Sequence, residues 1–517
     1  MSDYTAELPE SQPPPAGRNK RGLIAVVASV VAVVLIAGGG VAAWKFFLGG
    51  GPRPAEVLPG STFALVTVDL NPSGGQKVEA IKTLRKFPSW KKRTGVTPDS
   101  DVLKAIFDEA FKKGPCKALD YERDVKPWIG NRAGFGGVLL GESPAPVFAL
   151  QITDPDKART GFAKLVKCAD AGDDEFGFTT TDDYVIASDS TSHAKAIAAA
   201  GKKSTLAENA DFQKWTDEVG GPGIMNAYMG PKSIQILSES TGSGLDEITG
   251  GDPAAQDQLA DAFKKFKGGA AGLKFADGGM ELAVAGGAAA DAKTATVGKH
   301  VGDLPKDTAA VLALAVPPKF LDKLRSSSSK DLLSMGDFLT AGTGLKLPDD
   351  LITVLGSSLS ISVGGDAPAN LKDISNPADL PIGLLIHGDE TKIKAVVAKV
   401  EANTGANPSD IPATLASKDG KVALSTTSGY ADDLLGNGSL ADSKTFKDVV
   451  SHADEAQSVF YMSLDNEWMD RLRDQAVEEN DKDFKEVVDN LAVLRAVGAG
   501  TWSDGDTRHG LLRIALK

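Results

Sequence analysis

The feature that most constrains this chain is an uncharged apolar run near its N-terminus. From Leu23 to Ala43 the sequence reads LIAVVASVVAVVLIAGGGVAA, in which Ser29 carries the only hydroxyl. A helix rises about 1.5 Å per residue, so the run would span roughly 30 Å, the thickness of the hydrocarbon core of a bilayer. Residues 23–47 are therefore predicted to form one transmembrane helix, with Trp44 at the membrane interface.

The charges beside this run predict its orientation. Three basic residues precede it, whereas two follow it: Arg18, Lys20 and Arg21 before, and Lys45 and Arg53 after. Positive charge favours the cytoplasmic side, so residues 1–22 are predicted to be a disordered cytoplasmic tail. The lipid bilayer is then one partner of the chain, and everything after the helix lies outside the cytoplasm.

A cleaved signal peptide is the alternative interpretation of the run. Signal peptides have a shorter apolar region that ends in small residues, and Val41, Ala42 and Ala43 would suit such a cleavage site. The greater length of this run and the long tail before it favour an uncleaved anchor. Both interpretations place the bulk of the chain outside the cytoplasm.

Length and charge limit the class of the exported part. The chain has 517 residues, 42% of them hydrophobic, and a formal net charge of −13. This length is sufficient for two or three domains with cores of their own. Binding to nucleic acid depends on Lys and Arg displacing counterions, so nucleic acid is not expected as a partner.

The exported part contains an apparent internal repeat. LPGSTFALVTVDL at Leu58 is similar to LPKDTAAVLALAV at Leu304, and FALQITDPDKARTGFAKL at Phe148 is similar to IGLLIHGDETKIKAVVAKV at Ile382. Three later pairs follow in the same order: LAENADF with LADSKTF, AYMG with FYMS, and a closing hairpin in each half. After a stalk at residues 48–57, the sequence predicts two similar copies at 58–290 and 302–517. Chance alignment of two domains of similar composition is the alternative.

The fold class is predicted to be α+β. Hairpin patterns such as FGFTTTDDYVIAS at residues 176–188 occur beside amphipathic helical patterns such as DPAAQDQLADAFKKFKG at residues 252–268. Strands and helices do not alternate regularly, so the sheets are expected to be antiparallel or mixed.

The assembled features resemble a known family. They are a proline-rich tail, an apolar anchor, a Leu-Pro start to each half, and the segments DVKPWIGNRAGFGGV at Asp124 and FALQITDPDKARTGFAKL. Together they resemble an actinobacterial family of exported, membrane-anchored proteins that is catalogued as a domain of unknown function. The second half departs from the Pro-Trp pattern, with LITVLGSSLSISVGG at Leu351. The resemblance implies no catalytic residues.

The two cysteines, Cys116 and Cys168, are predicted to form a disulfide. Both lie in the first copy, which the predicted topology places in an oxidising compartment. Two buried free thiols are the alternative. A metal site is disfavoured because two cysteines without nearby histidines do not supply four ligands.

Sequence motifs for catalysis or cofactor binding are absent. The five histidines show no H-E-x-x-H pattern, and the Ser-x-x-Lys spacings at Ser89, Ser192 and Ser327 lack their companion motifs. The sequence has no G-x-S-x-G elbow, and neither its acidic clusters nor its glycines match the calcium-loop or dinucleotide patterns. No cofactor is therefore expected.

One basic segment stands out in this acidic chain. IKTLRKFPSWKKRTG, from Ile81, gathers six cations around two aromatic residues: Lys82, Arg85, Lys86, Lys91, Lys92 and Arg93. Near a bilayer, such a patch could contact anionic headgroups or acidic wall polymers. A solvated helix face is the alternative.

These observations predict a non-enzymatic envelope protein with two α+β copies outside the membrane. An envelope protein, a lipid or a wall ligand is the expected partner, held where the two halves meet. An envelope hydrolase with a site assembled from distant residues is the alternative.

Overall fold

A computed structural model gives the structure of most of the chain that follows the predicted transmembrane helix. It describes residues 52–69, 74–88, 102–168, 176–241, 264–276, 278–287, 295–318, 320–322, 343–366, 380–404, 414–478 and 482–517. The predicted tail and transmembrane helix lie outside these residues. Among the residues described, no helix combines the length and the apolar character that a bilayer crossing needs.

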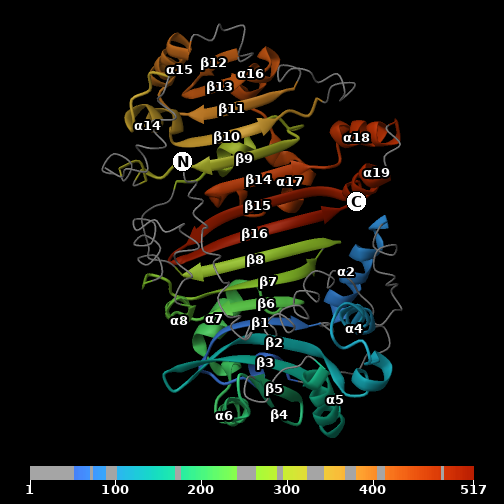
Figure 1. Cartoon of the computed structure of the whole chain (residues 1–517). Coiled ribbons are helices and arrows are strands. Elements are labelled where there is room, and N and C mark those ends of the chain that lie inside the picture. Colours follow the sequence, from blue (N-terminus) through green and yellow to red (C-terminus); the bar gives the residue numbers. More distant parts are fainter. Residues whose placement is uncertain are drawn as a thin grey trace, which may run out of the picture.

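The sixteen strands of the described residues join one antiparallel sheet (Figure 1), in the order β12-β13-β11-β10-β9-β14-β15-β16-β8-β7-β6-β1-β2-β3-β5-β4. The strands are β1 (Thr62–Asp69), β2 (Ile129–Leu140), β3 (Ser143–Ile152), β4 (Gly177–Thr180), β5 (Tyr184–Ser188), β6 (Met225–Met229), β7 (Gly269–Ala276), β8 (Gly279–Gly287), β9 (Ala310–Ala315), β10 (Ser358–Val363), β11 (Ile382–His387), β12 (Thr414–Lys418), β13 (Lys421–Ser425), β14 (Ser458–Ser463), β15 (Leu494–Asp504) and β16 (Thr507–Leu516).

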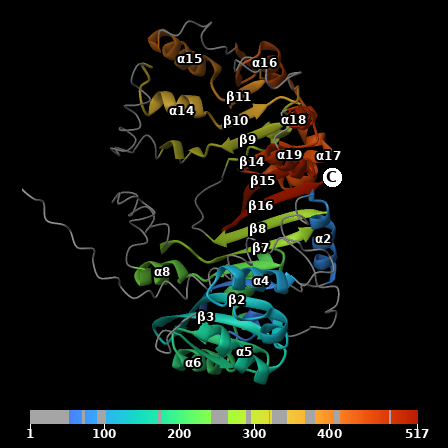
Figure 2. The ribbon, with the colours of Figure 1, turned by 45° about the vertical axis from the view of Figure 1, so that its right-hand side comes forward.

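The two halves of the chain meet edge to edge, through the antiparallel pairing of β8 with β16. Outward from this pair the strands follow the same order on both sides: β8, β7, β6, β1, β2, β3, β5, β4 in one half, and β16, β15, β14, β9, β10, β11, β13, β12 in the other. Figure 2 shows the strands continuing without a break from one half to the other. The sequence led us to expect separate sheets in the two halves. It did not reveal the single sheet, because this edge-to-edge pairing has no local signal in the sequence.

The helices lie on both faces of the sheet. They are α2 (Gly74–Arg85), α4 (Val102–Lys113), α5 (Pro155–Cys168), α6 (Thr191–Gly201), α7 (Ala210–Glu218), α8 (Ser233–Thr241), α11 (Gly298–Gly302), α14 (Asp349–Leu355), α15 (Glu390–Thr404), α16 (Ser428–Leu435), α17 (Lys444–Val449), α18 (Glu467–Glu478) and α19 (Lys482–Leu491), with short turns η1 (Pro54–Glu56), η2 (Tyr121–Val125), η3 (Leu206–Glu208), η6 (Leu440–Asp442) and η7 (Ala453–Glu455).

One face of the sheet, called face A here, is covered by helices in both halves. Ile197 of α6 and Trp215 of α7 pack on Leu65, Tyr184 and Tyr228. In the other half, side chains of α11, α16 and α17 pack on β9, β11, β14 and β15. Among the residues that the structure describes, these two clusters contain most of the large, fully buried side chains.

The opposite face, face B, is covered only toward its ends and sides. Phe107 of α4 and Phe162 of α5 pack on the outer strands of the first half. Val354 of α14 and Ile393 of α15 pack on the outer strands of the second half. At the sides, α2 packs on β7 and β8, and α18 with α19 packs on β15. The described helices leave the centre of face B open.

The structure confirms a mixed helix-and-sheet fold with antiparallel pairing. The hairpin predicted at residues 176–188 forms as β4 and β5. Residues 252–263, most of the helix predicted at 252–268, lie outside the described residues. Ordered packing begins before Leu58, inside the segment predicted as a stalk, because Tyr184 Oη donates a 2.7 Å hydrogen bond to the carbonyl oxygen of Pro52 and Ala55 is buried.

Candidate functional site

In β9, a central strand, side chains on both faces of the sheet are apolar. In β9 the sequence AVLALA places Val311 and Ala313 in the face A core, whereas Leu312 and Leu314 point to face B. Period-two alternation normally gives one buried face and one polar face. Here the second face is also apolar although the described helices do not cover its centre.

A single row of cross-strand partners on face B crosses all sixteen strands. Beginning at β12, the row consists of Leu415, Leu424, Leu384, Ile361, Leu312, Phe460, Ala499, Leu512, Leu282, Leu273, Met225, Val68, Ala133, Leu150, Val185 and Thr180. Thr180, at the far edge, is the one polar member. The row runs perpendicular to the strands and crosses from one half to the other without a break.

The rows on either side of this one are also largely apolar over the central strands. We call these three rows, from β10 to β2, the apolar band. Seven of its side chains are 36–50% exposed: Phe135, Leu282, Val284, Leu312, Leu314, Ile361 and Met462. Adjacent strands lie about 4.8 Å apart, so these ten strands extend the band over roughly 43 Å. Monomeric proteins rarely expose contiguous apolar surface of this kind unless it binds something.

Helices close the apolar band at its ends. Ile393 of α15 packs on Leu384, Leu415 and Leu424, where the row enters the outer strands of the second half. In the first half, Phe162 of α5 packs near Leu150 and Val185. The band is therefore long, narrow and bounded, a shape suited to an extended apolar molecule.

The predicted disulfide is confirmed. Cys116 lies just after α4 and Cys168 ends α5, with Cα atoms 5.2 Å apart. Both sulfurs belong to the cluster that holds α4 and α5 on the outer strands of the first half. The bridge thus fastens the helices that close one end of the band.

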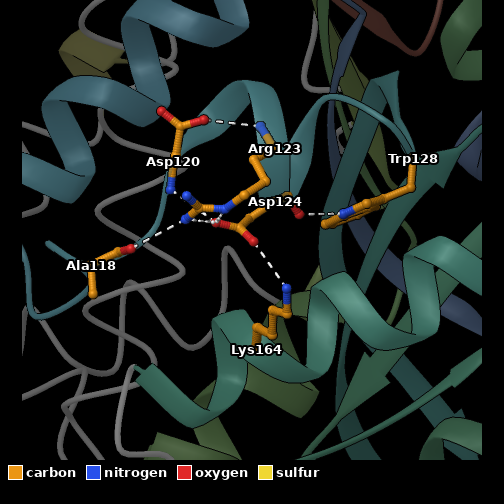
Figure 3. A network of polar contacts seen from close by, with 6 residues as sticks. All are labelled: Ala118, Asp120, Arg123, Asp124, Trp128 and Lys164. Carbon is orange, nitrogen blue, oxygen red and sulfur yellow. Dashed lines mark hydrogen bonds and ion pairs between the residues drawn. The ribbon is translucent and has the colours of Figure 1, made fainter.

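The segment DVKPWIGNRAG forms a polar clasp in this same region (Figure 3). The side chain of Asp124 is 4% exposed, and it accepts hydrogen bonds from Arg123 Nη2 at 2.7 Å and Lys164 Nζ at 2.9 Å. The Arg123 guanidinium holds the pKa of Asp124 well below its usual range, despite the opposing effect of burial, and Lys164 lowers it further. The clasp joins η2 to α5.

Trp128 completes this clasp from the apolar side. Its Nε1 donates a 2.7 Å hydrogen bond to the carbonyl oxygen of Asp124, and its ring meets Phe162 edge-on. Gly161 of α5 lies so close that an added Cβ would stand 2.0 Å from Trp128 Nε1. The Lys164–Asp124 contact and the packing of Trp128 on Gly161 and Phe162 thus hold α5 against η2, and the segment has a structural role here.

The basic segment is described only in part. Lys82 of α2 pairs with Glu79 at 2.8 Å, and Lys86 Nζ donates a 2.6 Å hydrogen bond to the carbonyl oxygen of Lys517. Arg85 is exposed at the end of α2. Lys91, Lys92 and Arg93 lie outside the described residues, so headgroup contact by the six cations stays a prediction.

The structure brings together one serine and two histidines that the sequence did not associate. Ser358 Oγ lies 2.6 Å from His300 Nδ1 and 3.2 Å from His387 Nδ1, and the two imidazole rings stack with centroids 3.6 Å apart. Burial lowers the pKa of both histidines, to about 4 for His387, where His300 and Lys421 add to the effect. Ser358 is 1% exposed, so a substrate cannot reach its hydroxyl in this conformation.

A small cavity of about 150 Å³ lies on face A, under η1 and α7. Its polar groups bond to one another: Arg132 Nε donates to Asp69 at 2.9 Å, and the Asn226 side-chain oxygen accepts from the Gly223 N–H at 2.7 Å. Within the described ranges, no group of three His, Cys, Asp or Glu side chains is placed to hold a metal. The apolar band is therefore the strongest candidate site.

Comparison with protein families bears out one part of the resemblance found in the sequence, the match to a domain of unknown function. The family model described as Protein of unknown function (DUF3352) matches residues 26–315, more than half of the chain. The chain belongs to the DUF3352 family. No curated protein matches it.

Sequence reasoning missed the two main features of this DUF3352 chain's candidate site. The alternation of AVLALA and SLSISV was visible, but a strand pattern does not reveal which strands become neighbours. Only the register of fifteen strand pairings turns scattered leucines and valines into one row. The histidine pair was hidden in the same way, since 87 residues separate His300 from His387.

Proposed function

We propose that this DUF3352 protein is an exported, membrane-anchored binding protein that holds the apolar part of a lipid on the apolar band. The observation that carries the proposal is the single row of apolar partners across face B, in which Ile361, Leu312 and Leu282 of the central strands are exposed. Burying a half-exposed leucine or valine against an acyl chain would contribute about 1 kcal/mol per side chain, so several such contacts suffice for binding.

The proposed anchor supports a lipid as the occupant. The uncharged run ends at Ala43, and ordered packing begins at Pro52, which Tyr184 of β5 holds in place. The linking residues reach at most roughly 30 Å, at about 3.3 Å each. The sheet would stand beside the bilayer, where lipid is the most abundant apolar molecule.

The matched strand order supports the proposal that the exported part arose by duplication. The sequence pairs fall on equivalent elements: Leu58 and Leu304 precede β1 and β9, and the helices after β3 and β11 are α5 and α15. Edge-to-edge pairing of the two copies through β8 and β16 doubles the length of the apolar band. A ligand would therefore contact both copies, as the sequence led us to expect.

Binding rather than catalysis is the proposed activity. The Ser358 cluster is the one observation that favours the hydrolase alternative, because a hydroxyl lies within hydrogen-bond reach of two imidazoles. Burial of Ser358 argues against it. Labelling of Ser358 by a fluorophosphonate probe in the folded protein would favour the hydrolase instead.

Photo-crosslinking tests the binding proposal. The full chain is placed in nanodiscs that contain a phospholipid with a diazirine in its acyl chain, and cross-linked peptides are mapped by mass spectrometry. We expect cross-links on β8, β9, β10 and β16, and about a tenfold loss in a Leu312→Gln/Leu314→Gln variant. A Val477→Gln/Val487→Gln variant is the matched control, because these side chains are 67% and 52% exposed on α18 and α19, away from the band.

Two results would overturn the proposal. Cross-links confined to residues 23–47 would show contact by the anchor alone. Cross-links between the bands of two chains, with none to lipid, would assign the band to self-association. The proposed topology has a separate test: a protease-sensitive tag placed after Lys517 should be cleaved on intact spheroplasts, and protection of the tag would refute export.

A further inference from the structure

One charged side chain interrupts the apolar character of face B over the central strands. Along the ten strands from β10 to β2, nearly all described residues on face B are apolar residues, glycine, serine or threonine. The two exceptions are Asn131, near the bulge in β2, and Arg508, near the start of β16. Arg508 lies opposite Ser503 of β15 and Gly286 of β8. Its side chain is exposed, and no described residue forms a hydrogen bond or ion pair with the guanidinium.

The residues around Arg508 form a polar margin at one side of the apolar band. Ser503 Oγ accepts a 2.9 Å hydrogen bond from Gln457 Nε2, so its own O–H stays available as a donor. Ser458 Oγ and Thr501 Oγ1 lie 2.6 Å apart in the next row. The face is also open here, because an added Cβ at Gly510 would meet only Thr501, at 3.9 Å.

The opposite margin of the band is different although the strand order is equivalent. At that margin lies the turn between β7 and β8, and the cross-strand pair next to it is Phe275 with Met280. The equivalent pair, next to the turn between β15 and β16, is Ser503 with Arg508. Ala80 and Leu84 of α2 cover that margin. Figure 1 shows the two turns at opposite sides of the sheet, with α2 beside the β7–β8 turn. An occupant therefore meets a polar, cationic margin on one side only.

The carboxylates near Arg508 do not neutralise it. Asp506, in the turn, pairs with Lys267 at 2.8 Å, and this contact lowers the pKa of Asp506. Asp504 is adjacent to Ser503 in an extended strand, so its side chain points to face A. The guanidinium of Arg508 is left as the cation nearest the apolar rows on this side.

We propose that Arg508 binds the anionic headgroup of the lipid, with Ser503 as a second donor, while the acyl chain follows the apolar band across β16 and β8. A guanidinium donates paired hydrogen bonds to a phosphate or carboxylate, and it remains charged at all physiological pH values. This inference rests on the proposed function and names the class of ligand, which is an anionic lipid rather than a neutral one.

Two photoprobes that differ only by a phosphate test the inference. The full chain is placed in nanodiscs of neutral lipid that contain either diazirine-labelled phosphatidic acid or diazirine-labelled diacylglycerol. We expect the phosphatidic acid probe to label the band preferentially, and Arg508→Gln to reduce that labelling about tenfold without changing the diacylglycerol labelling. Arg508→Lys should retain part of the preference.

Lys202→Gln is the control, because Lys202 is an exposed cation at the end of α6, a helix that packs on face A, away from the band. It should leave both labelling levels unchanged. If Arg508→Gln leaves phosphatidic acid labelling unchanged, or if Lys202→Gln reduces it to the same extent, the headgroup assignment is wrong while binding on the band stands. If neither probe labels the band of the unaltered chain, the proposed function itself fails.

Discussion

Leu282 of β8 and Leu512 of β16 are directly opposed across the pairing that joins the two halves of the chain. Each is also a member of the row of apolar partners, with Leu273 on one side and Ala499 on the other. This pair is where the row passes from one half to the other. The junction is therefore part of the candidate site as well as part of the fold.

The register that places Leu282 opposite Leu512 can be tested by replacing both leucines with charged residues. Like charges directly opposite in an antiparallel pair are unfavourable, whereas opposite charges attract. The Leu282→Lys/Leu512→Lys variant should be less stable than the Leu282→Lys/Leu512→Glu variant by about 1 kcal/mol in urea unfolding. A Leu282→Lys/Ile514→Glu variant is the control, because Ile514 is opposite Met280 and lies diagonal to position 282. Equal stability of all three variants would mean that the register is different.

Much of the local structure was predictable because it depends on neighbours in sequence. The helix after each of β3 and β11 follows a strand-turn-helix pattern, and Asp154 and Asp389 accept hydrogen bonds from the backbone N–H groups of Lys157 and Lys392, as residues at a helix start do. The hairpin of β4 and β5 was likewise visible in its alternation. The disulfide followed from the count of two cysteines and the predicted compartment.

The remaining features depend on contacts that sequence patterns do not encode. Nothing in β8 or β16 indicates that these two strands pair, because their alternation fits any apolar neighbour. The Asp124 clasp depends on Lys164, 40 residues further along the chain, reaching back to η2. Residues 23–47, predicted to form a transmembrane helix, lie outside the described residues, and this prediction still rests on hydropathy and length.

Removal of the disulfide should loosen one end of the sheet. In the chain-entropy description, closing a loop of 52 residues stabilises a protein by roughly 4 kcal/mol, and measured effects are usually 2–4 kcal/mol. A Cys116→Ser/Cys168→Ser variant should therefore unfold at lower temperature by calorimetry. The unaltered chain should show no free thiol after denaturation without reductant. Two reactive thiols in that assay would contradict the bridge.

Two helical glycines should respond to alanine in opposite ways. In α5, a Cβ at Gly161 would overlap the Trp128 ring, so Gly161→Ala should destabilise by about 2 kcal/mol through displacement of the indole. In α16, a Cβ at Gly429 would meet nothing within 4 Å, so Gly429→Ala should stabilise by up to about 1 kcal/mol through helix propensity. Denaturant midpoints of both variants are the measurement. A neutral Gly161→Ala would show that the Trp128 contact is loose.

Asp124 should make stability depend on pH at the acid end. Its pKa in the folded protein is below the unfolded value near 3.8, so its stabilising effect is complete above that value and is lost as pH falls below it. Asp124→Asn should cost about 2 kcal/mol at pH 7 and progressively less below pH 4. Asp156→Asn, at a carboxylate that is 93% exposed, is the control and should change little. A constant difference between pH 7 and pH 2 would contradict this account.

His300 and His387 should lower stability in the same direction as Asp124, but at a pH closer to neutral. The folded pKa of His387 is about 4 and that of His300 is also lowered, whereas both rise to about 6.5 when the chain unfolds. Between those values the unfolded chain binds more protons than the folded chain, so stability falls as pH decreases from about 6.5 toward 4. His387→Gln should reduce the dependence of the unfolding free energy on pH, measured by urea unfolding at pH 4.5, 5.5 and 7.

His193→Gln is the matched control, because the His193 side chain is 43% exposed at the start of α6 and pairs only with Asp189 among the described residues. An unchanged slope in His387→Gln, with His193→Gln also unchanged, would mean that the stacked pair opens to solvent before the sheet unfolds.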